Sequence, residues 1–230
     1  MIEFLSIPLP QDPAYHLFAD QRVLLGIPNF WNVASNIPFL VVGALGMRET
    51  ARHHADPLRA VWSVFFAGIF MTAFGSGYFH LDQDNESLAW DRLTMTVGFM
   101  SFVAIVIGEY LSLAWARRLL LPLLLIGAAS VLYWLQTETR GAGDLRPYAA
   151  VQFLPMLLIP AVVLLRRERS DLGKYIGWMI AFYFAAKVFE QYDRQVYAAG
   201  ELLSGHSLKH IVAALGPASM LLALRRRRTA

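Results

Sequence analysis

Five polar residues in two short stretches have the types and spacing of a hydrolytic metal site. Ser76 and His80 are four residues apart, and Asp91 follows eleven residues after His80, where the chain returns to apolar sequence. His206 and His210 are also four residues apart, at the start of the last apolar segment. Residues i and i+4 lie on one face of a helix, about 6 Å apart, so each pair can act on one centre.

Three histidines with a fourth position open to water form a typical catalytic zinc site. We therefore predict that His80, His206 and His210 bind Zn²⁺, which lowers the pKa of a bound water to about 7 and makes hydroxide available. Asp91 is the candidate acid/base for that water. Ser76 is the candidate hydrogen-bond donor to the oxyanion. This chemistry predicts metal-assisted hydrolysis of an amide or ester.

Each of these residues also has a structural alternative. His80 can be an interfacial residue, Ser76 can allow close helix packing, and Asp91 can be the N-cap of a helix. His206 and His210 can hydrogen-bond a neighbouring helix. Ionisable groups are costly in a membrane span, however, so several at one depth favour a shared function.

The composition indicates a membrane scaffold around these residues. The chain has 230 residues, of which 57% are hydrophobic and 16% charged, which is unlike a water-soluble domain. It contains no cysteine, so a transition metal must use nitrogen and oxygen ligands. The basic pI near 9.3 comes from residues in short connections between apolar segments, which predicts membrane topology and no nucleic-acid partner.

Apolar runs long enough to cross about 30 Å of hydrocarbon predict an all-α membrane protein, a bundle of seven transmembrane helices. The first and sixth runs are the most polar, and Lys187 and Glu190 in the sixth are expected to form an ion pair. The seven runs cover approximately residues 30–47, 60–80, 91–110, 115–134, 147–165, 175–192 and 206–224.

Most of the basic residues lie in alternate connections, which predicts the orientation. By the positive-inside rule the C-terminus is cytoplasmic and the N-terminus is outside, so the number of crossings is odd. This predicts an extracytoplasmic segment 1–29, a transmembrane hydrolase domain 30–224 and a basic cytoplasmic tail 225–230. All five site residues then lie toward the outer leaflet. The basic connections hold Arg48, Arg52, Arg59, Arg117, Arg118, Arg166, Arg167, Arg169, Lys174 and Arg225 to Arg228, with His53 and His54 expected to be solvated.

The ordered motifs resemble the alkaline ceramidase family, within a wider group (the CREST superfamily) of seven-helix membrane hydrolases that includes adiponectin and progestin receptors. The resemblance runs from about residue 20 to 220. It implies a membrane amidase that splits ceramide into a sphingoid base and a fatty acid. It also implies zinc ligation by the three histidines, acid/base catalysis by Asp91 and an oxyanion-side role for Ser76. The matching motifs are Phe30-Trp31-Asn32 with Ser35-Asn36, Gly75-Ser76-x-x-Phe79-His80, Asp91, and His206-x-x-x-His210.

The N-terminal segment departs from the family pattern. Eukaryotic members have a calcium site built from an acidic N-terminal segment and a Glu just before the Phe-Trp-Asn triplet. Here that last position is Asn29, and Tyr15 and Phe18 stand where acids are expected, leaving Asp20. The departure argues against calcium binding, and Asp20 is expected to pair with Arg22 or a nearby loop instead.

The short, uninterrupted chain resembles a bacterial member of the family, which implies a multi-pass protein of the inner membrane. Its lipid substrate would be ceramide or another long-chain N-acyl lipid. Two other classes remain open: a membrane receptor or binding protein with a structural metal, and a small proton-coupled transporter that uses Lys187, Glu190 and the histidines. The small-residue pattern from Gly43 to Gly46 does not decide the oligomeric state.

Overall fold

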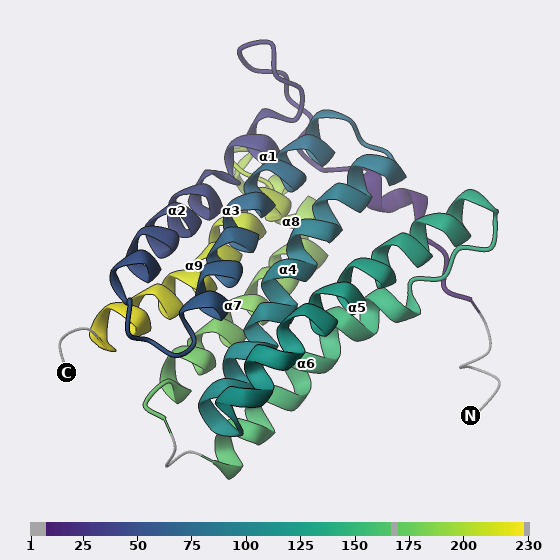
Figure 1. The fold of residues 1–230 in the computed structure, drawn as a ribbon. Coiled ribbons are helices and arrows are strands. Elements are labelled where there is room, and N and C mark those ends of the chain that lie inside the picture. The colour runs from purple at the N-terminus through teal and green to yellow at the C-terminus, as the bar shows by residue number, and fades with distance from the viewer. Residues whose placement is uncertain (1–7, 167–169, 228–230) are drawn as a thin grey trace.

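The computed structural model describes residues 8–166 and 170–227, which form a bundle of long helices and contain no strand (Figure 1). Arg167, Arg169 and Arg228 of the predicted basic clusters lie outside the described residues. The helical elements are η2 (Pro13–His16), α1 (Phe30–Ala34), α2 (Ile37–Arg52), α3 (Arg59–Leu81), α4 (Asn85–Tyr110), α5 (Leu113–Thr139), α6 (Arg146–Leu165), α7 (Gly173–Gln191), α8 (Asp193–Gly200) and α9 (Gly205–Arg227).

Among the described residues, six helical segments are long and apolar enough to cross a membrane: α1 with α2, then α3, α4, α5, α6 and α9. Helices suit this environment because they satisfy their own backbone hydrogen bonds. The predicted sixth run also forms a helix, α7, which has 19 residues. It falls outside the set of six. The seven predicted runs are therefore all helical, and six have the composition of a span.

Two helix boundaries differ from the sequence prediction. The first predicted run is broken between α1 and α2 at Ser35 and Asn36. Helix α4 begins at Asn85, and its N-cap is Asp84, whose carboxylate accepts a hydrogen bond from the Ser87 backbone amide at 2.7 Å. Asp91 therefore lies inside the helix, so the N-cap alternative for this residue is wrong.

The aromatic core of the bundle lies toward the end of the bundle at which α3 begins. Trp62, Phe65, Phe66 and Phe102 are fully buried there. Helix α2 packs closely against α3, because a Cβ atom at Gly43 would lie 2.5 Å from the Phe70 backbone nitrogen. The small residues of α2 are therefore used for packing within the chain.

The N-terminal segment runs along the opposite end of the bundle, where α3 ends and α4 begins (Figure 1). The Leu145 backbone amide donates a hydrogen bond to the Leu9 carbonyl at 2.8 Å, which fixes the segment beside the start of α6. The Gln11 backbone amide donates to the Glu138 carboxylate at 3.0 Å. Phe18 is 5% exposed, so this segment is packed into the bundle and covers its end.

Candidate functional site

Three histidines meet beneath the N-terminal segment. His80 lies in the last turn of α3, and His206 and His210 lie in the first two turns of α9. All three side chains are buried, and one ring nitrogen from each lies within 4.8 Å of the others. The Nε2 atoms of His80 and His210 are 3.3 Å apart. The structure thus confirms that the three predicted ligands form one group that could hold a metal ion.

The geometry and the unpaired nitrogens both fit a transition metal. Two nitrogens at 2.0–2.1 Å from a tetrahedral ion lie about 3.3–3.4 Å apart, which matches the separation between His80 and His210. The buried Nε2 of His206 has no hydrogen-bond partner among the described residues, and neither has Nδ1 of His80, the ring nitrogen other than the one that faces His210. Buried polar atoms are usually satisfied. A bound ion would satisfy Nε2 of His206, and imidazole nitrogen is suited to zinc, copper, iron or nickel.

The orientation of His210 is set by Ser35, which begins the break between α1 and α2. The Ser35 Oγ lies 2.8 Å from His210 Nδ1 and 3.1 Å from the Asn32 carbonyl oxygen. A hydroxyl has one proton, so Ser35 donates to the carbonyl and accepts from His210 Nδ1–H. This places the ring proton on Nδ1 and leaves the Nε2 lone pair facing His80. Such a partner fixes the tautomer of a metal-binding histidine.

Asn32 and Asp193 hold the start of α9 in place. The fully buried Asn32 accepts a hydrogen bond from Ser207 Oγ at 2.8 Å and donates one to the Asp20 carbonyl at 3.1 Å. Asp193 accepts from the His206 backbone amide at 2.7 Å and from the Ala19 amide at 2.9 Å. The N-terminal segment, α1 and Asp193 at the start of α8 therefore position the first turns of α9, which carry both histidines.

The residues that the resemblance places at calcium-ligand positions make other contacts. Asp20 pairs with Arg22 at 2.7 Å, as expected from the sequence. Burial raises the pKa of Asp20, but the hydrogen bonds from Arg22 outweigh this and keep the pKa below its ordinary value. The Asn29 side chain donates to the His80 carbonyl at 3.0 Å. The Phe18 ring packs against His80 and His206, with ring centroids 4.7 and 4.4 Å apart. Phe18 thus covers two of the histidines with an apolar ring.

A cavity of about 200 Å³ adjoins the histidines, and Ser76, Asp91 and His210 line it together. Ser76 and Asp91 are buried, and Asp91 Oδ1 has no hydrogen-bond partner among the described residues. The cavity thus brings both predicted catalytic residues to one space with His210.

The cavity is polar at one end and apolar at the other. On each of four helices the lining changes from a polar residue near the histidine end to apolar residues one to three turns deeper. The pairs are Ser76 and Ile69 on α3, Asp91 and Met95 with Phe99 on α4, Glu190 and Met179 on α7, and His210 and Pro217 on α9, and Thr72, Gln152 and Tyr183 add polar groups to the same lining. A molecule with a polar group next to a hydrocarbon chain is complementary to this gradient.

Charged residues form part of the polar end. Glu190 pairs with Lys187 at 2.5 Å, which confirms the predicted ion pair, and also with Lys209 at 2.6 Å. Arg92 lines the same cavity. Sequence reasoning missed Lys209 and Arg92 as site residues, although each is the immediate neighbour of a predicted one, His210 and Asp91.

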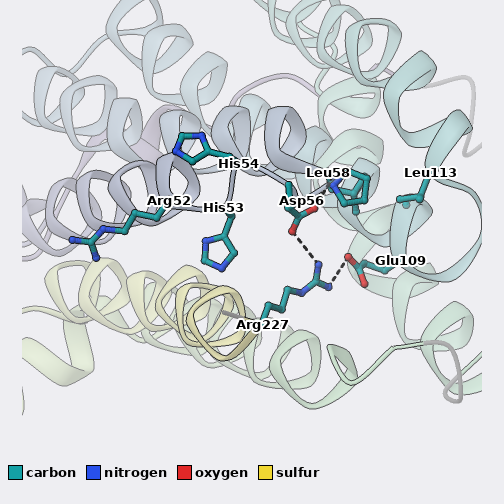
Figure 2. A pocket seen from close by; sticks show the side chains of 11 residues that line it. Arg52, His53, His54, Asp56, Leu58, Glu109, Leu113 and Arg227 are labelled. Carbon is teal, nitrogen blue, oxygen red and sulfur yellow. Dashed lines mark hydrogen bonds and ion pairs between the residues drawn. The ribbon is translucent and has the colours of Figure 1, made fainter. Parts of the chain in front are cut away.

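A second cavity, of about 520 Å³, lies at the other end of the bundle (Figure 2). Arg227 of α9 bridges Asp56 at 3.4 Å and Glu109 at 2.5 Å there. The His53 side chain is only 8% exposed, and its Nδ1 lies 3.0 Å from the Glu49 carbonyl oxygen. The expectation of a solvated His53 is therefore wrong, because the side chain folds back onto α2; His54 is exposed as expected. These contacts connect helix ends and bring no predicted catalytic residue together.

Comparison with known proteins identifies the family of the chain. No curated protein sequence matches the chain. A family model described as ceramidase matches residues 22–229, which is nearly the whole chain and includes all five predicted site residues. The protein therefore belongs to the ceramidase family, hydrolases that act on the amide bond of ceramide.

Proposed function

We propose that the protein is a zinc-dependent integral-membrane amidase that hydrolyses ceramide or a related long-chain N-acyl lipid to a fatty acid and a free amine. The observation that carries this proposal is the position of the histidine group at the polar end of a cavity whose other end is apolar. A lipid amide has the same division, since its polar amide adjoins a hydrocarbon chain. The amide would therefore lie beside His210 with its acyl chain among Ile69, Phe99 and Met179.

His80, His206 and His210 would hold the zinc ion. When bound, zinc supplies a Lewis acid and lowers the pKa of a coordinated water to about 7. The three-histidine donor set leaves room for such a water, as in other catalytic zinc sites. Phe18 would keep bulk water from the histidines, so that the water supplied to the amide is the one held inside the site.

Asp91 is the group proposed to move the proton. Its Oδ1 is buried, lines the cavity and has no partner among the described residues, so it is available to accept a proton from the attacking water. As the C–O bond forms and the C–N bond breaks, the same carboxyl group would deliver that proton to the leaving nitrogen. Ser76 would donate a hydrogen bond to the carbonyl oxygen as negative charge develops on it.

The proposed topology has seven crossings, with the N-terminus outside and the site toward the outer leaflet of a bacterial inner membrane. The sequence distribution of Lys and Arg supports this orientation. Helix α7 would be the seventh crossing, because its charged residues Lys187 and Glu190 line the cavity and pair with each other and with Lys209. Charges directed into a bundle and paired in this way are tolerated within a span.

The test is to measure metal content and product release on purified protein in detergent. We expect about one zinc per chain and release of fatty acid from a long-chain ceramide. Asp91→Asn should retain the zinc and lose hydrolysis, because it removes a proton acceptor and leaves the histidines unchanged. Asp56→Asn, at the other end of the bundle, is the matched control and should keep both.

Other outcomes separate the alternatives. Stoichiometric metal without release of fatty acid from any N-acyl lipid would favour a receptor or binding protein. Absence of metal would favour the transporter. Hydrolysis by Asp91→Asn at the wild-type rate would show that another group moves the proton.

A further inference from the structure

Arg92 is a buried cation at the cavity that the hydrolysis described above does not use. It lies seven residues inside α4, about 10 Å from the start of that helix, and is 6% exposed. The guanidinium lies 4.0 Å from the centroid of the Trp134 ring and 4.8 Å from that of Tyr148. Aromatic faces stabilise a cation partly, but they do not satisfy its N–H groups. A buried arginine is costly unless its charge and donors are paired.

The hydrogen bonds of Arg92 are incomplete. Its Nη2 donates to Gln11 Oε1 at 2.6 Å, whereas the buried Nη1 has no hydrogen-bond partner among the described residues. The nearby Glu138 carboxylate accepts hydrogen bonds from the Gln11 backbone amide at 3.0 Å and from Trp134 Nε1 at 3.1 Å. The guanidinium is therefore held firmly in place with one donor group left over.

The other charges around the cavity do not supply the missing anion. Glu190 is shared between Lys187 and Lys209 and also accepts from the Tyr15 hydroxyl at 3.3 Å. Without any metal, the charged side chains that line the cavity are three basic and two acidic ones: Arg92, Lys187 and Lys209, and Asp91 and Glu190. The lining is thus cationic. Its second acid, Asp91, forms no ion pair within 4 Å in the part of the chain that the structure describes, and its Oδ1 has no hydrogen-bond partner there, so no carboxylate pairs with Arg92.

The position of Arg92 indicates which half of a lipid amide would approach it. The acyl chain is directed to the apolar end, so the amine half lies at the polar end, where Asp91, Arg92 and Lys209 line the wall. We propose that Arg92 forms an anion-binding subsite and that the preferred substrate is an N-acyl lipid whose amine half carries an acidic group, a carboxylate or a phosphate. Arginine is suited to both because its planar fork donates two parallel hydrogen bonds. The inference rests on the proposed amidase function.

The experiment compares substrates that differ only in this group. N-palmitoylglycine carries a carboxylate, N-palmitoylethanolamine a hydroxyl, and its O-phosphate ester a phosphate, all on the same acyl chain. We expect wild-type kcat/KM to be about ten- to a hundredfold higher for an acidic substrate than for the neutral one, as for a buried charge-assisted hydrogen bond. The comparison of N-palmitoylglycine with the phosphate ester shows whether a carboxylate or a phosphate is preferred.

Arg92→Gln should abolish this ratio, and Arg92→Lys, which keeps the charge and loses the fork, should keep part of it. Arg140→Gln, an exposed residue between α5 and α6, is the matched control and should leave the ratio unchanged. Zinc content reports whether each variant is folded. A wild-type ratio near one, or a ratio that Arg92→Gln does not change, would overturn the subsite.

A binding measurement separates this inference from the amidase proposal. If none of the three lipids is hydrolysed, the proposed function fails. The subsite is then tested by comparing how much N-palmitoylglycine and N-palmitoylethanolamine each raise the melting temperature of the protein. Stabilisation by the acid that is lost in Arg92→Gln would support it. Equal stabilisation by both lipids would refute it. Palmitate is the third ligand, and binding of palmitate alone would show that Arg92 holds the released fatty acid instead.

Discussion

Replacement of Ser35 by alanine tests whether the histidine group is organised as a metal site. Ser35 and His210 are both buried, and their hydrogen bond is 2.8 Å long. In the metal-free Ser35→Ala variant the His210 proton can move to Nε2. Metal binding at Nε2 forces that proton onto Nδ1, where alanine offers no acceptor. The penalty of the unsatisfied N–H therefore falls on the metal-bound state.

The expected magnitude follows from this hydrogen bond. Leaving a buried donor unsatisfied costs about 1–3 kcal/mol, and each 1.4 kcal/mol is a factor of about ten in an equilibrium constant. We therefore expect zinc to bind Ser35→Ala about 10- to 100-fold more weakly than wild type, which is the usual effect of losing such a partner. Ser35→Thr keeps the hydroxyl and should recover most of the affinity.

The assay is competition for zinc against a chromophoric chelator, with purified protein in detergent. Ser130→Ala is the matched control, because Ser130 is also buried but bonds only the Gly127 carbonyl of its own helix, at 2.7 Å. That control should bind zinc like wild type. Wild-type affinity in a folded Ser35→Ala variant would refute the reasoning, because it would mean that the hydrogen bond from His210 to Ser35 does not support metal binding.

Three further predictions concern the site, the packing and the response to acid. His210→Ala should lose both zinc and activity, measured by metal analysis and product release, and stoichiometric zinc in this variant would place the metal elsewhere. Gly43→Ala should lower the melting temperature in detergent through overpacking of about 1–3 kcal/mol, since its Cβ would meet the Phe70 backbone; an unchanged melting temperature would show that α2 can move away. The hydrogen bonds from Arg146 lower the pKa of Asp144 to about 2. This carboxylate therefore stabilises the fold fully above its unfolded pKa near 3.9, and its contribution is lost as the pH falls toward 2. The free energy of unfolding should be measured against pH for wild type and for Asp144→Asn. The difference between the two proteins should shrink as the pH falls from about 4 toward 2, and a difference that does not change with pH would contradict this.

The convergence of the three histidines could be predicted from the sequence because it depends on local rules. Spacing of four residues puts His206 and His210 on one face of a helix. The alternation of apolar runs and basic connections then placed His80 at the same end of the bundle. Ser76 and Asp91 were found in the same way, and both line the cavity with His210.

The partners that complete the site could not be predicted, because they depend on tertiary contacts. Ser35 and His210 are 175 residues apart in the chain, and no periodicity relates them. Phe18 was interpreted only as a missing calcium ligand, whereas it packs on two histidine rings. Arg92 could not be identified from the sequence either, since its burial among aromatic rings depends on how α4, α5 and α6 pack.

The hydrogen bonds of Asn32 and Ser35 have a consequence for the order in which the protein is made. A chain leaves the ribosome from its N-terminus, so α1 is inserted long before α9 exists. The hydrogen bonds between Asn32 and Ser207 and between Ser35 and His210 can form only after α9 has been made. Both join residues that are very far apart in the sequence. The histidine group therefore cannot assemble before α9 has been made. Tight metal binding would therefore be possible only in a chain that has been synthesised and inserted as far as α9.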